Sequence, residues 1–269
     1  MVAGSAGLAE GKSILHRQNI MKSADEFIYG LRPLIEAVES GREIERVYIR
    51  KNLQGELYQQ LADLIKKRAI PYQLVPVEKL NRITRKNHQG IVAYVSHISY
   101  HAIDQLIPNI YESGEDPLVV VLDGITDVGN FGAIARTAEC AGVHSIIVPW
   151  YGSAPVNADS LKTSAGALSR IPVCRVQNIF YTVRYLKNSG LRICSATEKA
   201  EGLYFKASLT GPLAIIIGSE DKGIDTGLLK VSDELVRIPL MGQISSLNVS
   251  VAAGILIYEA VKQRGKRES

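Results

Sequence analysis

Three polar clusters along the chain hold side chains that could act together on a ligand. Their candidate residues are Asn130 and Arg136, Glu220, and Ser246 and Asn248. A guanidinium such as that of Arg136 can be directed at a phosphate or a reacting oxygen, and the Glu220 carboxylate can accept hydrogen bonds from a ribose or an amine. Each cluster also has a purely structural interpretation: Arg136 could form a surface ion pair, Glu220 could belong to a polar turn, and Asn248 could cap a helix. The group around Asn248, however, holds more polar side chains than one cap needs.

Each cluster follows a run of apolar residues that predicts a β-strand. Six such runs occur, at 118–123, 145–149, 173–176, 191–196, 213–218 and 235–240. Helical patterns alternate with them, at 132–141, 158–168, 179–188 and 248–261, and Asn130 is expected to cap the first of these helices. This alternation predicts an α/β fold with a mostly parallel, doubly wound sheet. Ligands of such sheets bind at the carboxyl ends of the strands, where the three clusters would lie.

The N-terminal part of the chain predicts a smaller α/β domain over residues 27–97. Its helices are expected at 26–41, 55–68 and 77–83, and its strands at 44–49, 72–77 and 90–96. Residues 98–116 contain Pro108 and Gly114 and are expected to be a linker to the larger domain at 117–264. Residues 1–26 show no sustained period and predict a flexible extension, and 265–269 predict a frayed tail.

The charge of the chain is uneven. The net charge is +4, yet residues 1–100 carry 15 Lys and Arg against 10 Asp and Glu. The densest basic segment of this part offers four candidate RNA contacts: Arg82, Arg85, Lys86 and His88. Such patches bind phosphates, although a solvated charged loop is an equal alternative. Aromatic residues are sparse around this segment, with Tyr72 and Tyr94 nearby, so RNA recognition is expected to depend on shape and backbone more than on stacking.

Several classes of protein are disfavoured by the sequence. No apolar run approaches the roughly 20 residues that span a bilayer, and no signal peptide is evident. The three cysteines, Cys140, Cys174 and Cys194, form no CxxC pair and are expected to be buried and reduced, as in cytoplasmic proteins. The histidines lack the spacing of metal ligands. Glycines at 124, 129 and 132 do not match G-x-G-x-x-G, and no P-loop occurs, which argues against oxidoreductases and NTPases.

Taken in order, the three clusters resemble the motifs of a known family. Residues 123–136, 217–223 and 238–250 are similar to motifs 1, 2 and 3 of the SpoU (TrmH-like) RNA 2′-O-ribose methyltransferases. Residues 28–30 and 88–90 are similar to the substrate domain of the RlmB-like branch, whose members modify a guanosine in 23S rRNA. The resemblance extends over residues 27–264 and does not include the first 26.

The resemblance implies a fold and a reaction that composition and spacing do not give. It implies a SPOUT catalytic domain with a deep trefoil knot, an N-terminal domain like ribosomal protein L30e, and a homodimer. A cytoplasmic location without metal or membrane is expected from the cysteines, the histidine spacing and the hydropathy described above. S-adenosylmethionine would bind at Gly218, Ile238, Met241, Ser246 and Leu247. The methyl group would pass to a ribose 2′-hydroxyl, with Arg136 as the family's proposed general base, and with Asn130, Glu220, Ser246 and Asn248 positioning the substrate.

Two other functions remain open from the sequence. A member of the same family could act on tRNA, since the N-terminal domain argues for rRNA only by analogy. A non-catalytic RNA-binding or ribosome-assembly protein could also carry this fold. The presence of Asn130, Arg136, Glu220 and Asn248 together favours an enzyme.

Overall fold

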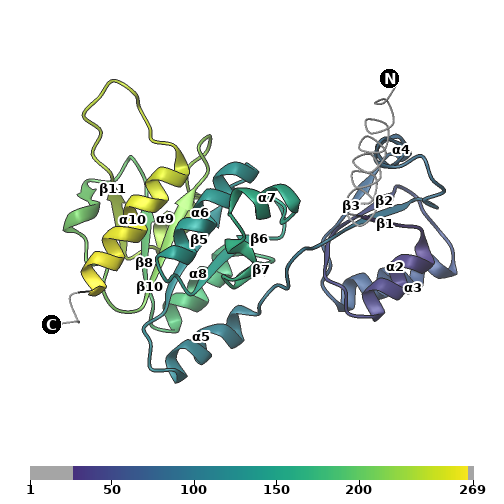
Figure 1. Ribbon diagram of the computed structural model, residues 1–269, viewed down its shortest axis with the longest axis horizontal. Helices are drawn as coiled ribbons and strands as arrows, with labels where there is room; N and C mark the ends of the chain where they lie inside the picture. The colour runs from purple at the N-terminus through teal and green to yellow at the C-terminus, as the bar shows by residue number, and fades with distance from the viewer. Residues whose placement is uncertain (1–26, 266–269) are drawn as a thin grey trace, which may run out of the picture. The chain divides into compact units, whose positions relative to one another are not determined.

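The computed structural model describes residues 27–265, so the expected extension at 1–26 and most of the expected tail lie outside the described residues. The chain divides into two compact units, with the boundary between Ser96 and His97 (Figure 1).

The first unit is a four-stranded sheet with three helices. Its sheet has the order β1-β4-β2-β3, with strands β1 (Phe27–Tyr29), β2 (Ile44–Arg50), β3 (Tyr72–Val75) and β4 (Ile91–Val95). The helices are α2 (Leu31–Glu39), α3 (Glu56–Lys67) and α4 (Val77–Ile83). The helix expected from residue 26 begins only at Leu31, because residues 27–29 pair with β4 and Gly30, at φ +91°, turns the chain.

The second unit is built on a seven-stranded sheet in which every ladder is parallel. Its order is β7-β6-β5-β10-β8-β11-β9, and its strands are β5 (Leu118–Asp123), β6 (Ser145–Pro149), β7 (Val173–Val176), β8 (Arg192–Ala196), β9 (Gly202–Leu203), β10 (Leu213–Gly218) and β11 (Glu234–Arg237). The expected parallel α/β sheet is confirmed. The sequence pattern did not predict the two-residue strand β9.

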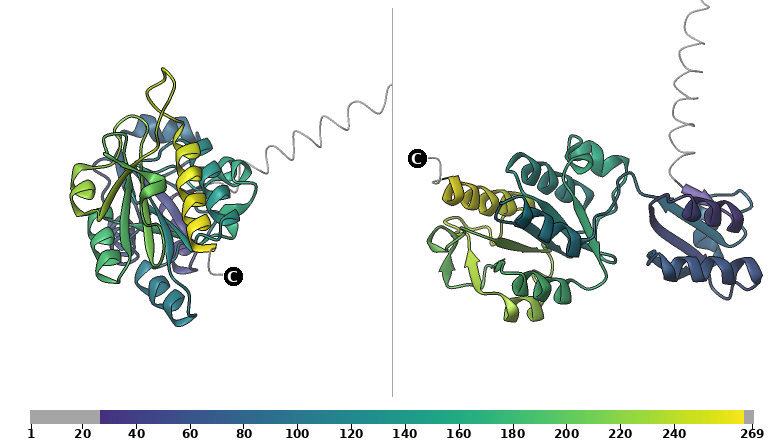
Figure 2. Two further views of the ribbon diagram at one scale, coloured as in Figure 1. Left: turned by 90° about the vertical axis from the view of Figure 1, so that its left-hand side faces the viewer. Right: turned by 90° about the horizontal axis from the view of Figure 1, so that it is seen from below.

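Helices cover both faces of this sheet, which explains why its strands are almost wholly apolar. One face packs against α6 (Val128–Cys140), α7 (Ala158–Thr163) and α10 (Val249–Arg264), and Figure 2 shows α10 in yellow along the sheet. The other face packs against α5 (Ile103–Glu112), α8 (Ile179–Asn188) and α9 (Thr226–Val231). Two short 3-10 helices, η1 (Ala167–Ser169) and η2 (Tyr204–Lys206), complete the unit.

Two expectations about this unit differ from the structure. The segment 98–116, expected to be a linker, contains α5, and Ile107 and Ile110 of that helix are buried in the core. Apolar residues at helical spacing outweigh the local cost of Pro108 inside the helix. Cys140 is exposed on α6, whereas Cys174 and Cys194 are buried as expected.

Candidate active site

The site lies where the carboxyl ends of four strands meet. Strands β5, β10, β8 and β11 are neighbours and parallel, so Gly218 pairs with Asp123 on one side and Ile217 with Ala196 on the other. The loops that follow these strands therefore emerge at the same edge of the sheet. This is the edge at which ligands bind in open α/β sheets.

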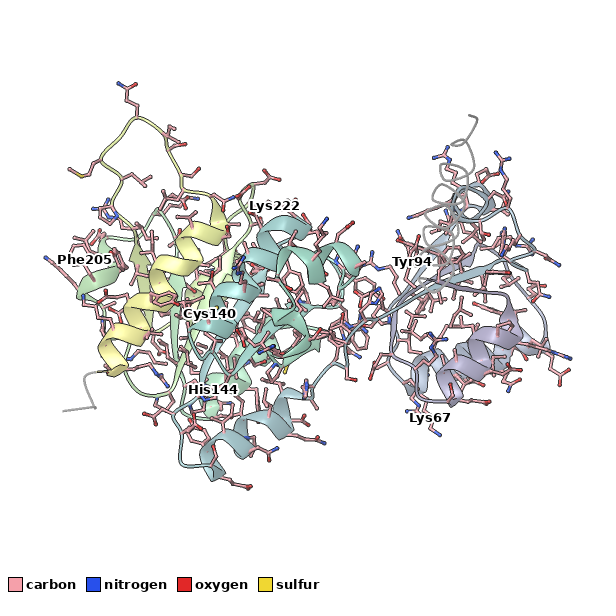
Figure 3. The ribbon with its side chains drawn as sticks, in the orientation of Figure 1. Lys67, Tyr94, Cys140, His144, Phe205 and Lys222 are labelled. Carbon is pink, nitrogen blue, oxygen red and sulfur yellow. The ribbon has the colours of Figure 1, made fainter. Side chains whose placement is uncertain are left out.

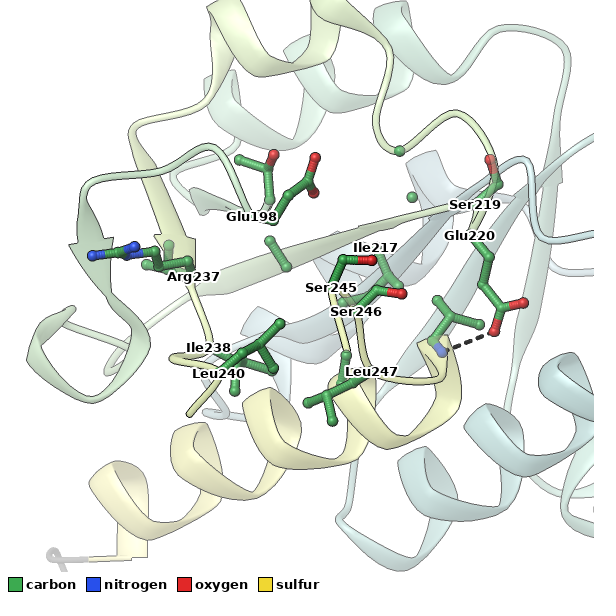
Figure 4. Close-up of a pocket in the computed structure, with 17 residues that line it drawn as sticks. Glu198, Ile217, Ser219, Glu220, Arg237, Ile238, Leu240, Ser245, Ser246 and Leu247 are labelled. Carbon is green, nitrogen blue, oxygen red and sulfur yellow. Dashed lines mark hydrogen bonds between the residues drawn. The ribbon is translucent and has the colours of Figure 1, made fainter. Parts of the chain in front are cut away.

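A hydrogen-bonded network joins the three polar clusters at this edge. Glu220 Oε1 accepts hydrogen bonds from Asn248 Nδ2 at 3.0 Å, from Asn130 Nδ2 at 3.3 Å and from Val249 N at 3.1 Å (Figure 4, dashed line for the last). Asn248 Nδ2 also donates to Asn130 Oδ1 at 2.9 Å. Among the described residues, none donates to Glu220 Oε2, so that oxygen can accept a hydrogen bond from a ligand.

Asn248 serves the helix and the network with different atoms. Its Oδ1 accepts hydrogen bonds from Ser250 N at 3.0 Å, Val251 N at 3.4 Å and Ser250 Oγ at 2.5 Å, and so caps α10. Its amide nitrogen makes the two bonds of the network. The sequence left open whether Asn248 caps a helix or belongs to the site. In the structure one side chain does both.

The first of two pockets at this edge collects most of the expected cofactor residues. Gly218 lines it, as do Ile238, Ser246 and Leu247, which are labelled in Figure 4. Met241 does not: its side chain is 97% exposed. The loop between β11 and α10 extends away from the sheet (Figure 1), and it places Leu240 and Ser245, rather than Met241, at the pocket.

Gly218 allows a close approach of two backbone segments beside this pocket. A Cβ atom on residue 218 would lie 2.2 Å from the carbonyl carbon of Gly223 and 2.4 Å from the nitrogen of Ile224. The tight turn that follows is closed by a hydrogen bond from Gly223 N to Ser219 O at 2.9 Å. Because Gly218 has no side chain, the turn can fold back closely against the end of β10, and this turn carries Glu220.

The second pocket is the more polar of the two and adjoins the first. Its polar side chains are Thr126, Asp127, Asn130, Ser219, Glu220, Asp221 and Lys222. Ser219, Glu220 and Val249 line both pockets. Glu220 therefore stands between an apolar pocket and a polar one, and Figure 3 shows Lys222 at this end of the unit.

The structure corrects the expected role of Asn130 and separates Arg136 from both pockets. The N-cap of α6 is Asp127, whose Oδ1 accepts a hydrogen bond from Asn130 N at 2.7 Å, and this frees the Asn130 side chain for the network. Arg136 is exposed two turns further along α6 and lines neither pocket. Within residues 27–265, no side chain forms a hydrogen bond or an ion pair with its guanidinium.

Sequence reasoning missed Thr197 and Glu198, which follow β8 and line the first pocket. Their position at the carboxyl end of a strand was the signal that could have identified them. Asp123, the first residue of motif 1, lines neither pocket. Its Oδ2 accepts a hydrogen bond from Asp225 N at 2.8 Å and so joins the end of β5 to the start of α9. Burial raises the pKa of Asp123; the hydrogen bond from Asp225 N opposes this rise, and the negative charge of Asp225 adds to it.

The basic segment of the first unit separates into exposed cations and one buried histidine. Arg82, Arg85 and Lys86 are exposed. His88 is buried: Nε2 lies 2.9 Å from Asn81 Oδ1, and Nδ1 accepts a hydrogen bond from Gly90 N at 3.0 Å. His88 therefore holds the turn before β4, and the prediction of an RNA contact at this residue does not fit its burial.

No group of three or more His, Cys, Asp or Glu within the described residues could hold a metal ion. No helix in the described part of the chain is both long and apolar enough to cross a membrane.

Comparison with known proteins gives a family match for each unit. Residues 117–258 match the SpoU rRNA Methylase family, and residues 27–101 match the family described as RNA 2′-O ribose methyltransferase substrate binding. The 23S rRNA (guanosine-2′-O-)-methyltransferase RlmB of Vibrio parahaemolyticus is 38% identical over 245 residues, which cover 90% of this chain and 98% of that protein. The putative TrmH family tRNA/rRNA methyltransferase YacO of Bacillus subtilis is 34% identical, over 91% of this chain and 98% of its own length.

A solved structure agrees with these relatives. The crystal structure of the SpoU methyltransferase AviRb from Streptomyces viridochromogenes, in complex with AdoMet, aligns with a TM-score of 0.57 and 26% identity, over 97% of this chain and 100% of that one. The resemblance inferred from the three motifs is confirmed, and the chain belongs to the SpoU rRNA methylase family.

Proposed function

We propose that this protein is an enzyme that transfers a methyl group from S-adenosylmethionine to the ribose 2′-hydroxyl of a guanosine in 23S rRNA. The observation that carries the proposal is the network of Asn130, Glu220 and Asn248 between two adjoining pockets at the carboxyl edge of the sheet. The named activity of the RlmB relative and the AdoMet bound to the AviRb structure support the same reaction.

The first pocket fits the chemistry of S-adenosylmethionine. Its walls include the apolar side chains of Ile217, Ile238 and Leu247, which suit an adenine ring, and the exposed loop backbone around Ser246 can pair with the polar edge of that ring. The carboxylate of Glu198 can attract the positive charge of the cofactor. When bound, this cofactor supplies an electrophilic methyl group on a sulfonium.

The residues of the network would position the ribose in the second pocket. Glu220 Oε1 accepts hydrogen bonds from three N–H donors, which would hold the carboxylate in one orientation and leave Oε2 to accept a hydrogen bond from a ribose hydroxyl. Holding the 2′-oxygen against the methyl donor makes the reaction effectively unimolecular, and this can supply a large part of the rate. Ser246, at the border of the first pocket, can orient either ligand.

The protein would act as a homodimer in which Arg136 completes the site of the partner subunit. An apolar stripe of α10 faces outward, with Val251 and Tyr258 each 50% exposed. Thr137, the neighbour of Arg136, lies beside Gly254 of this stripe, since a Cβ on that glycine would be 3.6 Å from Thr137 Cγ2. Exposed apolar stripes of this kind favour self-association. A guanidinium normally stays protonated, so Arg136 would orient a phosphate or the ribose rather than accept its proton.

Three further features of the family are part of this proposal. The catalytic unit would contain the trefoil knot, the first unit would be the L30e-like RNA-binding domain, and the protein would work in the cytoplasm on ribosomal RNA. Action on tRNA is the second candidate, because the YacO relative is named as a tRNA/rRNA methyltransferase.

Transfer of label from S-adenosyl-[methyl-³H]methionine to purified 23S rRNA and to total tRNA separates these functions. We expect label in 23S rRNA and none in tRNA. Label in tRNA alone would establish the second candidate. Cofactor binding without transfer to either RNA would favour a non-catalytic RNA-binding protein, and the absence of cofactor binding by calorimetry would contradict the proposal altogether.

A further inference from the structure

The sheet of the first unit gathers four aromatic rings on one face. Phe27 is the register partner of Tyr94, and Tyr29 and Tyr48 are both partners of Val92. Because side chains alternate between the two faces of a strand and register partners share a face, all four rings point to the same side. Neighbouring ring centroids are 6.0–6.3 Å apart, so the rings form a continuous surface, here called the aromatic face.

Within the first unit, the aromatic face is only partly covered. On the opposite face of the sheet, α2 and α3 build the larger core. On the aromatic face, α4 contributes the buried Leu80 and the partly buried Ile83, which pack near β3 and β4. The four rings remain half-buried, and Figure 3 shows Tyr94 on this sheet.

Cations frame the rings. Lys79 Nζ lies 4.4 Å from the centroid of the Tyr48 ring, and Lys86 Nζ lies 5.5 Å from that of Tyr29. Arg46 is the register partner of Tyr94, and its Nε is the single buried side-chain nitrogen or oxygen within residues 27–265 that lacks a hydrogen-bond partner. The face thus combines π surfaces with positive charge, and one buried donor has no acceptor in the described chain.

We propose that the aromatic face binds single-stranded RNA, with unpaired bases stacked on its tyrosines and phosphates contacted by Lys79 and Lys86. This inference rests on the proposed function only in taking RNA as the substrate. Proteins that bind single strands combine aromatic stacking platforms with a basic groove, and RNA recognition commonly targets loops whose bases are unstacked. The expectation that aromatics were sparse is wrong here, because residues 27, 29, 48 and 94 are far apart in sequence and meet only through strand pairing.

The test uses the full-length protein and a single-stranded RNA oligonucleotide that carries 2-aminopurine. Tyr29→Leu keeps an apolar side chain but removes the ring, and is expected to weaken binding by about 5- to 150-fold. Tyr29→Phe keeps the ring and should bind within about twofold of wild type. Tyr72→Leu is the matched control, because Tyr72 is 46% exposed and lies on the opposite face, as the partner of Val47.

The salt dependence distinguishes stacking from charge. Tyr29→Leu should leave the slope of log K against log salt unchanged, whereas Lys86→Gln should reduce it by about 0.7, because one phosphate of the strand is no longer neutralised. Quenching of 2-aminopurine by the wild-type protein reports stacking directly and does not depend on whether a variant folds.

Two results would overturn the inference. One is wild-type binding without quenching of 2-aminopurine. The other is a folded Tyr29→Leu variant, with an unchanged thermal transition, that binds as tightly as wild type. If the wild-type protein instead binds no RNA and transfers no methyl group to 23S rRNA, it is the proposed function that fails, so the two failures are distinguishable.

Discussion

Two substitutions at Asn248 separate its role in the helix from its role in the network. Asn248→Ala removes both the oxygen that caps α10 and the nitrogen that donates to Glu220 and Asn130. Asn248→Ser retains a side-chain oxygen that can cap, since serine and asparagine are comparable N-caps, but it has no amide to reach Glu220. Both variants therefore lose the hydrogen bonds to Glu220 and Asn130, but only Asn248→Ala also loses the helix cap.

The hydrogen bonds set the expected size of each effect. Loss of an N-cap costs about 1 kcal/mol, or about 2–4 °C in Tm for a unit of this size, and we expect it for Asn248→Ala alone. Loss of a hydrogen bond to a charged group costs about 1.5–3 kcal/mol. Because Glu220 keeps its bonds from Asn130 and Val249, we expect the lower half of that range in both variants. This corresponds to a fall of about 10- to 50-fold in kcat/KM.

Differential scanning calorimetry measures the first effect, and initial rates of methyl transfer to 23S rRNA measure the second. Both variants should be slow, and Asn248→Ala should melt about 2–4 °C below Asn248→Ser, because only the alanine variant also loses the cap. If Asn248→Ser transferred methyl groups at the wild-type rate, the link between Asn248 and Glu220 would have no part in positioning the substrate. If both variants lost the same Tm, the assignment of separate atoms to cap and network would be refuted.

Three other predictions concern single positions in the second unit. Gly218→Ala would place a methyl group against backbone at 2.2 Å, so we expect a loss of about 1–3 kcal/mol in urea unfolding and weaker cofactor binding by calorimetry; unchanged values would contradict the tight turn. Burial raises the pKa of Asp233, but hydrogen bonds and nearby positive charge lower it by more, so the net shift is downward. The main partner is Lys187, whose Nζ lies 2.7 Å from Asp233 Oδ1. The charged carboxylate therefore stabilises the fold above the ordinary pKa near 3.8, and this stabilisation is lost as the pH falls below that value. Asp233→Asn should therefore cost about 1 kcal/mol or less at pH 7, and the difference from wild type should shrink in acid; a difference independent of pH would count against the pair. Burial, reinforced by the nearby Glu234 carboxylate, raises the pKa of Cys194 to about 12, so a thiol reagent at pH 8 should leave Cys194 unmodified until the protein unfolds.

The parallel sheet could be predicted because its strands are short apolar runs separated by clear helical patterns. Strands such as β5 and β10 begin and end where the sequence pattern placed them. Helix α5 was not predicted, since proline and glycine around 108–114 outweighed the apolar spacing that packs the helix against the sheet. The extent of β1, three residues long, depends on its pairing with β4, which no local pattern reveals.

The candidate site could be predicted as a set of residues but not as a geometry. Asn130, Glu220 and Asn248 are as far as 118 positions apart, and only the order of the strands brings them together. Met241 was predicted at the pocket because it lies in a motif, yet the path of its loop leaves it exposed. Glu198 was missed because β8 becomes a neighbour of β10 only in the folded sheet.

Mass spectrometry of nuclease digests of 23S rRNA shows whether the network around Glu220 positions a ribose for methyl transfer. The RNA is incubated with S-adenosylmethionine and either the wild-type protein or Glu220→Gln. We expect a single 2′-O-methylated guanosine with the wild type and at least tenfold less of it with the variant. Methylation on a base, or equal ribose methylation by both proteins, would contradict this role of the network.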